Sequence, residues 1–310
     1  MGWKAMGWNR LRIAIEKKRF AQSVRRIRQT AALRMQEPGP AIVTMLCKRD
    51  IDPYLLAFKS LYRHLNRGNA LVLNDGSLDR ADQQLLAQHI PWIEFRDLAA
   101  VDTGSCPQGG CWERLFTLVE VSQRQYAMQL DADILVMRPV EEVNRLIEQP
   151  QAFALTNLMR PGICTLRQAS AYTRASTWAA SAHVQPVSET AFERLENADQ
   201  RYYLRGSAAF TGIPAGRASI DTVVAFSDEM RRLIGEQWRQ WGSEQVACNY
   251  LIANLDGAEE LPCPKYANSM PHIDILASAL GHFFGTQRYI DGRYRQAAER
   301  VIGELLAGGH

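Results

Sequence analysis

The sequence has no long apolar run and no excess of cysteine, glycine or proline, and each absence excludes a class of protein. No segment approaches 18 uninterrupted apolar residues, and the longest candidates, such as residues 41–47, have the length of a strand, so a membrane-spanning helix is not expected. The 21 glycines and 13 prolines form no repeat or low-complexity segment, which excludes collagen-like structure. With 46% hydrophobic residues, the 310-residue chain can bury the core of an elaborated α/β domain.

Cysteine is too sparse and scattered for a disulfide framework or a zinc ribbon. Of six cysteines, only Cys106 and Cys111 lie close together, and no second pair follows, so free thiols are expected. The N-terminus does not resemble a secretory signal, because its basic residues never give way to a continuous apolar segment. We therefore expect a protein of the cytoplasm, or one bound peripherally to the inner face of the membrane.

Charge of one sign is concentrated at one end of the chain. Residues 1–37 carry ten Lys or Arg against two Glu, whereas residues 38–310 carry 26 basic and 31 acidic residues. The leader, defined as residues 1–37, is therefore strongly basic and the rest mildly acidic. We expect three parts: this leader, a main domain at 38–300 and a C-terminal tail at 301–310.

The leader has the pattern of a basic amphipathic helix. Apolar residues follow one another at separations of 7, 4, 3 and 4, namely Ile13, Phe20, Val24, Ile27 and Ala31. Residues 1–36 can therefore lie on an anionic membrane surface, or pack on a partner or on their own domain. Trp3, Trp8 and Phe20 suit a membrane interface. Nucleic acid is not an expected partner, because no base-reading module follows. Residues 37–40, Glu-Pro-Gly-Pro, are expected to end the helix in a stiff joint.

Beyond the leader, strand-like and helix-like segments alternate. Apolar, strand-sized runs lie at residues 41–47, 69–74, 92–95 and 126–130. Helical patterns lie between them, and the first is opened by Asp52 as N-cap with Pro53 in its first turn. This alternation predicts an α/β fold with a Rossmann-like, mainly parallel sheet that helices cover on both faces. Ligands of such sheets bind beyond the carboxyl ends of the strands.

Two carboxylates stand where one of these strands ends. The run at 126–130 leads directly into Asp131 and Asp133, and a second apolar run follows. In an extended segment residues i and i+2 project to the same side, so both carboxylates could share one hard cation such as Mg²⁺ or Mn²⁺. The alternative is a pair of solvated carboxylates that cap a turn. The apolar flanks favour the cation, because uncompensated buried charge is costly.

The segments around this pair resemble a known family. Cys111-Trp-Glu-Arg-Leu-Phe, followed by Gln129-Leu-Asp-Ala-Asp-Ile-Leu-Val, is similar to the GT-A glycosyltransferases, most closely to glycosyltransferase family 8 and its relatives. The resemblance implies that Asp131 and Asp133 bind the Mn²⁺ or Mg²⁺ ion that bridges the diphosphate of a nucleotide-sugar donor, by default a UDP-sugar. It also implies that Arg114 lies near this donor.

A segment near the C-terminus resembles the family's His-x-x-Gly-x-x-Lys motif. It reads Gly281-His-Phe-Phe-Gly-Thr-Gln-Arg288. By this match His282 is the third metal ligand, and Gly285 and Arg288 belong to the donor site. Arginine in place of lysine suits a diphosphate, since its guanidinium fork can bind two oxygens. His272 is the competing histidine.

Other residues follow the family's order less specifically. Residues 205–213 resemble its small-residue strand beside the sugar. Asp75 stands in an Asp-Gly-Ser turn that resembles the uracil-binding turn of family 2 enzymes, and the alternative is an Asx-type turn. Glu244 and Gln245 follow Ser243, the expected N-cap, at a helix start where they can face the donor sugar or the acceptor hydroxyl. We take both as candidate catalytic residues.

These features predict a metal-dependent glycosyltransferase that moves a sugar from a nucleotide-diphosphate donor to a glycan or lipid-linked acceptor. Membership of family 8 implies retention of the anomeric configuration, with the donor phosphate accepting the proton, whereas an inverting enzyme would use Glu244 as its base. One alternative is a sugar nucleotidyltransferase, which needs a Gly-rich phosphate loop where this chain has Cys47-Lys-Arg-Asp50. The other is a non-catalytic scaffold that recruits partners through its leader.

Overall fold

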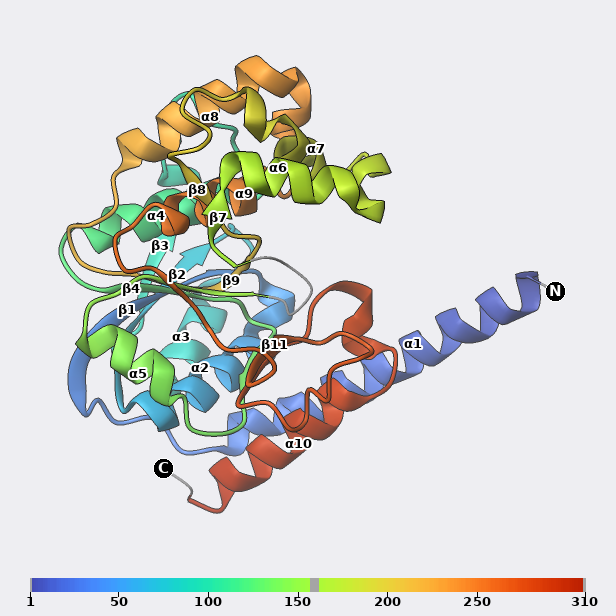
Figure 1. Cartoon of the computed structure of the whole chain (residues 1–310). Coiled ribbons are helices and arrows are strands. Elements are labelled where there is room, and N and C mark those ends of the chain that lie inside the picture. Colours follow the sequence, from blue (N-terminus) through green and yellow to red (C-terminus); the bar gives the residue numbers. More distant parts are fainter. Residues whose placement is uncertain (1, 157–161, 309–310) are drawn as a thin grey trace.

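The central element of the fold is a seven-stranded sheet with the strand order β10-β6-β9-β4-β1-β2-β3. The computed structural model describes residues 2–156 and 162–308 (Figure 1). The strands are β1 Glu37–Leu46, β2 Arg67–Asn74, β3 Glu94–Asp97, β4 Ala127–Leu130, β6 Phe153–Leu155, β9 Ser207–Ile213 and β10 Glu259–Glu260. All neighbouring strands pair in parallel except that β9 runs antiparallel to both β4 and β6. The predicted α/β fold with a mainly parallel sheet is confirmed.

Both faces of the sheet are buried, which explains why its central strands are continuously apolar. Successive side chains of a strand point to opposite faces. In β1, Ile42 and Leu46 join one hydrophobic core, and Ala41 and Val43 join the other. The sheet therefore separates two cores, and each needs its own layer of helices.

Helices form one layer on each face of the sheet (Figure 1). The first core takes side chains from α2 Ile51–Leu65, α3 Arg80–His89, α5 Glu141–Glu148 and α10 Arg293–Leu306. The second core takes side chains from α4 Trp112–Ser122, α6 Leu166–Ala175, α7 Val184–Ala191, α8 Ile220–Ile234 and α9 Ser243–Ala253. We call α6, α7 and α8, with the short helices η4 Thr177–Ala180 and η6 Gly235–Arg239, the helical lobe.

A smaller sheet brings the C-terminal part of the chain to the end of β4. Its strands are β5 Ile134–Val136, β11 Tyr266–Asn268 and β12 Leu280–His282, in the order β11-β12-β5. β12 runs antiparallel to β5, with His282 opposite Ile134. Because β5 follows Asp133 directly, this register places His282 beside the acidic pair. The short strands β7 Cys164–Thr165 and β8 Tyr202–Tyr203 pair with each other in the region of the helical lobe.

The leader packs on the body through its second half. It forms α1 Gly2–Val24 and the short helix η1 Arg25–Gln29. Phe20, Val24 and Ile27 are buried in the first core, and the Phe20 ring stacks on that of Tyr294 with 4.1 Å between the ring centroids. The first half of α1 projects away from the domain (Figure 1). Of the three predicted surroundings of the leader, a membrane, a partner or its own domain, these three residues therefore pack on their own domain.

Several local expectations for the leader are corrected. Ala31 is exposed, while its neighbour Thr30 is buried, so the apolar stripe ends at Ile27. The side chains of Trp3 and Trp8 lie outside the described residues. The expected joint at 37–40 is instead the first part of β1, where the strands approach so closely that a Cβ on Gly39 would lie 2.6 Å from the Gly68 nitrogen.

Other sequence-based details have clear outcomes. Asp52 does not cap α2, which begins one residue earlier; its carboxylate instead accepts two hydrogen bonds from Arg28 at 2.6 and 3.1 Å. This pair ties the leader to α2. None of the six cysteines, all of which are described, forms a disulfide, as expected. Among the described residues, no helix combines the length and apolar character that crossing a membrane requires.

Candidate metal centre and its polar surroundings

Asp131, Asp133 and His282 converge at the carboxyl end of β4. One potential ligand atom of each lies within 4.8 Å of those of the other two. The sequence predicted an extended segment for Asp131 and Asp133, and this prediction is wrong. The two residues lie in a turn in which the Ile134 nitrogen donates to the Asp131 carbonyl at 3.1 Å. The turn still directs both carboxylates to one point, and His282 arrives there on β12.

His282 is oriented by a neighbour that the sequence did not indicate. Its Nδ1 lies 2.7 Å from Asn268 Oδ1 and 3.4 Å from Ser207 Oγ, and its Nε2 lies 3.4 Å from Asp133 Oδ1. When Nδ1–H donates to Asn268, Nε2 keeps its lone pair. This lone pair then faces a carboxylate oxygen, an unfavourable arrangement unless a cation or a proton lies between them. Two carboxylates and one imidazole so arranged fit a divalent cation such as Mn²⁺ or Mg²⁺.

Two arginines neutralise the acidic groups around this point. Arg114 is buried and donates to Asp131 at 2.5 Å and to Glu244 at 3.2 Å. Arg288 pairs with Asp133 and also donates to the Phe283 carbonyl at 2.8 Å. Each arginine is thus paired and hydrogen-bonded, so its positive charge can be kept in a largely buried site.

The same contacts separate the pKa values of the acidic groups. Burial raises the pKa of Asp131 against the opposing effect of Arg114. Burial also acts to raise the pKa of Asp133, but its neighbours His282 and Arg288 outweigh this effect and hold that pKa below its ordinary value. For Glu244, burial outweighs Arg114 and raises the pKa to about 7. Divergent pKa values of neighbouring groups are typical of functional sites.

Glu244 and Gln245 lie in the first turn of α9. The N-cap is Gly242 with φ of 100°, and not Ser243, whose Oγ instead accepts a hydrogen bond from Trp112 Nε1 at 3.0 Å. Gln245 Oε1 accepts from the Ala208 nitrogen at 3.4 Å, and its Nε2 donates to Gln185 Oε1 at 3.3 Å. Glu244 therefore faces Arg114 in the interior, and Gln245 lies between the start of β9 and the helical lobe.

The structure supports the remaining predicted site residues to different degrees. Arg288 and Gly285 belong to the short helix η7 Gly285–Tyr289, and Gly285 has a φ of 54° that favours glycine. Asp75 follows β2, and its Oδ1 accepts hydrogen bonds from the nitrogen and the hydroxyl of Ser77 at 2.9 and 2.5 Å. Asp75 is thus engaged in the Asx-type turn, and nucleobase binding stays a prediction. His272 is exposed and is not part of the potential ligand group.

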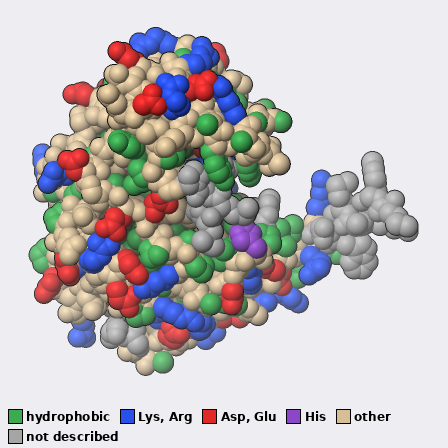
Figure 2. Space-filling model, viewed as in Figure 1, with side chains coloured by type: hydrophobic (Ala, Val, Ile, Leu, Met, Phe, Trp, Pro, Cys, Tyr) green, Lys and Arg blue, Asp and Glu red, His purple; other side chains and the backbone are tan. Residues whose placement is uncertain are grey.

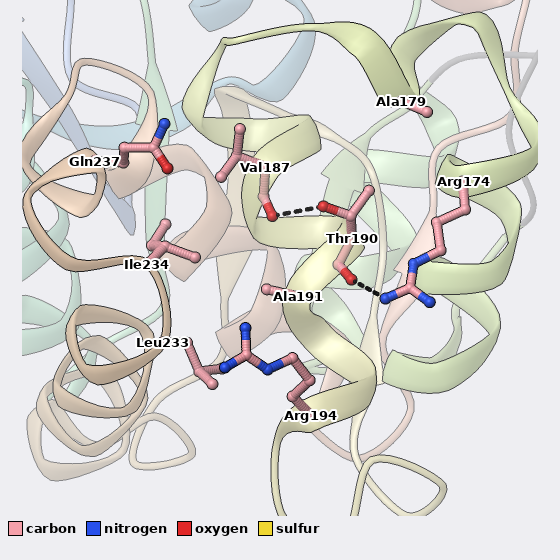
Figure 3. Close-up of a pocket in the computed structure, with 9 residues that line it drawn as sticks. All are labelled: Arg174, Ala179, Val187, Thr190, Ala191, Arg194, Leu233, Ile234 and Gln237. Atoms are coloured by element: carbon pink, nitrogen blue, oxygen red, sulfur yellow. Dashed lines mark hydrogen bonds between the residues drawn. The ribbon is translucent and has the colours of Figure 1, made fainter.

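A surface groove of about 640 Å³ lies elsewhere, within the helical lobe (Figure 3). Arg174, Arg194 and the apolar side chains of Val187 and Leu233 are among the residues that line it. Arg174 points across to α7, where it donates to the Thr190 carbonyl at 2.9 Å. No residue that lines this groove belongs to the Asp131, Asp133 and His282 group, so the groove is a separate feature.

No protein-family model and no curated protein sequence matches the chain. Among solved structures, an active-site mutant of LgtC is similar, with a TM-score of 0.50 and 14% identity over 85% of this chain and 95% of that one. The galactosyltransferase LgtC in complex with donor and acceptor sugar analogues has a TM-score of 0.49, with the same identity and coverage. The glycosyltransferase GlyE of Streptococcus pneumoniae, without ligand, also has a TM-score of 0.49, with 15% identity over 87% of this chain and 62% of that one. At such identity the similarity to LgtC shows the fold, and the GT-A fold predicted from the sequence is confirmed.

Proposed function

We propose that the chain is a metal-dependent glycosyltransferase that moves a sugar from a nucleotide-diphosphate donor, a UDP-sugar, to a glycan or lipid-linked acceptor. The observation that carries this proposal is the convergence of Asp131, Asp133 and His282 at the carboxyl edge of a sheet with the GT-A fold. That edge is where ligands bind in open α/β sheets. A fold alone does not define an activity, so the side chains at the edge decide it.

The donor is held at this edge by its diphosphate. Asp131, Asp133 and His282 would bind the Mn²⁺ or Mg²⁺ ion, which acts as a Lewis acid for the departing diphosphate. Arg288 pairs with Asp133 in the free protein and can turn its guanidinium to a phosphate oxygen when the donor binds. Gly285 lets the chain turn toward Arg288 at the start of η7. Asp75, at the end of β2, is the candidate contact to the nucleobase.

The reaction retains the anomeric configuration in this proposal. An inverting enzyme needs a carboxylate base that reaches the acceptor hydroxyl. Glu244, the candidate base, is only 3% exposed and bonded to Arg114. The acceptor hydroxyl would therefore attack the anomeric carbon on the side of the leaving group. Its proton passes to the departing phosphate oxygen as the carbon–oxygen bond to phosphate breaks. Gln245 would orient the sugar, and Glu244 would hold Arg114.

The projecting part of the leader would bring the enzyme to an anionic membrane surface, where lipid-linked acceptors reside. Leu11 and Ile15 on α1 are 56% and 42% exposed, and the neighbouring Lys17 and Lys18 are exposed as well. Apolar and basic side chains on one exposed helix favour binding to anionic lipid. Sedimentation with anionic vesicles tests this, since a Leu11→Glu/Ile15→Glu variant should remain in the supernatant. Equal sedimentation of both proteins would rule the anchor out.

A screen of nucleotide-sugars for hydrolysis in the presence of Mn²⁺ tests the catalytic proposal. We expect release of the nucleoside diphosphate from at least one UDP-sugar, and loss of this release with EDTA. The anomeric configuration of a transfer product tests the mechanism, because a β-linked product from an α-donor would exclude retention. Release of pyrophosphate from a nucleoside triphosphate and a sugar phosphate would identify a nucleotidyltransferase instead.

A further inference from the structure

The helical lobe presents a large aromatic side chain to solvent. Trp178 in η4 is 51% exposed. Its backbone is fixed, because its nitrogen donates to Ser176 Oγ at 3.2 Å and its carbonyl accepts from the Ser181 nitrogen at 2.9 Å. An exposed indole on a backbone that hydrogen bonds hold in place is typical of a surface that binds a ligand or a partner.

Arg205 supports this indole. Its guanidinium carbon lies 5.3 Å from the centroid of the Trp178 ring, a cation–π distance. Arg205 is held in turn by Glu189 of α7 at 2.5 Å, and the Glu189 side chain is only 1% exposed. Glu189 also accepts hydrogen bonds from Thr173 Oγ1 at 2.8 Å and from the Tyr203 hydroxyl at 3.2 Å. The stack is therefore anchored in a buried polar network, which limits its movement.

The same network leads to the candidate centre. The Tyr203 hydroxyl accepts from Gln185 Nε2 at 3.3 Å, and Gln185 accepts from Gln245 at 3.3 Å. The backbone makes a second connection between Arg205 and the centre. Arg205 precedes Ser207 by two residues, and Ser207 Oγ lies 3.4 Å from His282 Nδ1. Two residues span at most roughly 7 Å. The residue that supports the indole and the neighbour of His282 therefore belong to one short segment, which connects the aromatic surface to the candidate centre.

Apolar side chains accompany this aromatic surface. Figure 2 shows hydrophobic side chains along the edge of the helical lobe that faces the part carrying α1 and α10. Tyr172 of α6, which is 40% exposed, lines a small recess together with Arg205 and Glu189. Aromatic faces beside charged and polar groups suit a ligand that is itself apolar on one face and polar at its edge.

We propose that Trp178, backed by Arg205 and Glu189, binds a sugar ring of the acceptor, one unit or more beyond the hydroxyl that receives the transferred sugar. A pyranose ring has an apolar C–H face that stacks on the negative face of an indole, and its hydroxyl edge can accept from a guanidinium. The subsite would therefore select an oligosaccharide over a monosaccharide acceptor. This inference rests on the proposed function, because it assigns the acceptor side of the same reaction.

The test compares Trp178→Ala with Trp178→Phe and with Trp241→Ala as a matched control. Trp241 is also an exposed tryptophan, at 72%, and its ring lies 6.1 Å from that of His183, outside the stack of Arg205 on Trp178. Each fluorescently labelled full-length protein is applied to an array of oligosaccharides with UDP and Mn²⁺. Hydrolysis of the UDP-sugar by water is measured in parallel, since it needs no acceptor.

We expect Trp178→Ala to weaken glycan binding about tenfold or more, which corresponds to about 1.4 kcal/mol. Trp178→Phe should weaken it less, Trp241→Ala should bind like the wild type, and all should hydrolyse the donor equally. Glycan binding by Trp178→Ala at the wild-type level would overturn the inference. A wild-type protein that hydrolyses the donor but binds no glycan would also overturn it. Loss of self-association in Trp178→Ala would overturn it as well, because Trp178 would then contact a second copy of the chain. A protein that hydrolyses no donor would refute the proposed function itself.

Discussion

The leader is predicted to be part of the folded domain, and Phe20→Ala is the perturbation that tests this. Phe20 is 3% exposed and stacks on Tyr294, which in turn stacks on Phe283 with 4.5 Å between the ring centroids. Phe283 is the residue after His282, so the aromatic column also supports the candidate centre. Truncation of a buried phenylalanine to alanine costs about 3–5 kcal/mol.

That loss is large beside the total stability of a domain, which is about 5–15 kcal/mol. Deleting residues 1–36 should cost still more, because it also removes Val24, Ile27 and the partners of Lys59. The Lys59 ammonium is buried and donates to Thr30 Oγ1 at 2.8 Å and to the Ala31 carbonyl at 2.6 Å. Burial lowers the pKa of Lys59 to about 8. Without these two acceptors, a buried ammonium would lose most of its hydrogen bonds.

The assay is equilibrium unfolding in urea, followed by tryptophan fluorescence. Phe20→Ala should lower the midpoint with little change in the slope. Leu11→Ala is the matched control on the same helix, since Leu11 is 56% exposed, and it should change stability by less than about 0.5 kcal/mol. Deletion of residues 1–9 should behave like the control, and deletion of 1–36 should yield insoluble or unfolded protein. A soluble 37–310 fragment that unfolds cooperatively near the wild-type midpoint would refute the reasoning.

Two further predictions concern the candidate centre. Asn268→Ala removes the group that orients His282 and should weaken Mn²⁺ binding about 10–100-fold at unchanged secondary structure; an unchanged affinity in calorimetry would show that Asn268 does not orient the ligand. Glu244→Gln should alter the pH dependence of stability. Burial raises the pKa of Glu244 from 4.5 to about 7, so the folded state binds a proton that the unfolded chain releases between these values. The stabilisation that protonated Glu244 provides is present below pH 4.5 and is lost as the pH rises through 7. Relative to the glutamine variant, the wild type should therefore lose about 3 kcal/mol between pH 4 and 8, and a constant difference between the two would contradict the assignment.

The parts of the fold that were predictable are those with local signals. The apolar runs that became β1, β2 and β4 were found because both faces of the sheet are buried, which makes the strands continuously apolar. The Asp131 and Asp133 pair was found because a strand end and its polar residues are adjacent in sequence. The position of His282 beside this pair was predicted only through the resemblance to a family, since no local pattern distinguishes a metal ligand from a structural histidine.

The errors concern contacts between distant residues. Phe20 suits a membrane interface by sequence, but its partner Tyr294 lies 274 residues away, and no local pattern indicates that pairing. Asn268 reaches His282 only through the parallel register of β11 and β12. Asp52 resembled an N-cap, yet the ion pair with Arg28 of the leader takes its carboxylate. In each case a tertiary contact that no local sequence pattern indicates decided the outcome.

The helical lobe was the least readable region, for a related reason. The contacts on which the proposed acceptor subsite depends are polar and join residues far apart in sequence, such as Arg205 with Glu189 and Gln245 with Gln185. Such contacts leave no periodicity in the sequence, unlike an apolar stripe. The stack of Arg205 on Trp178 is therefore visible only in three dimensions.

The most direct test of the metal-dependent glycosyltransferase proposal is a calorimetric titration of UDP into the full-length protein with and without Mn²⁺, repeated with Asp133→Asn. Asp133 contributes one of the three potential ligands and pairs with Arg288. The wild type should bind UDP tightly only when Mn²⁺ is present, and the variant, while still folded, should bind it at least tenfold more weakly. Absence of UDP binding by the wild type with Mn²⁺, or equal binding by the variant, would contradict the proposal.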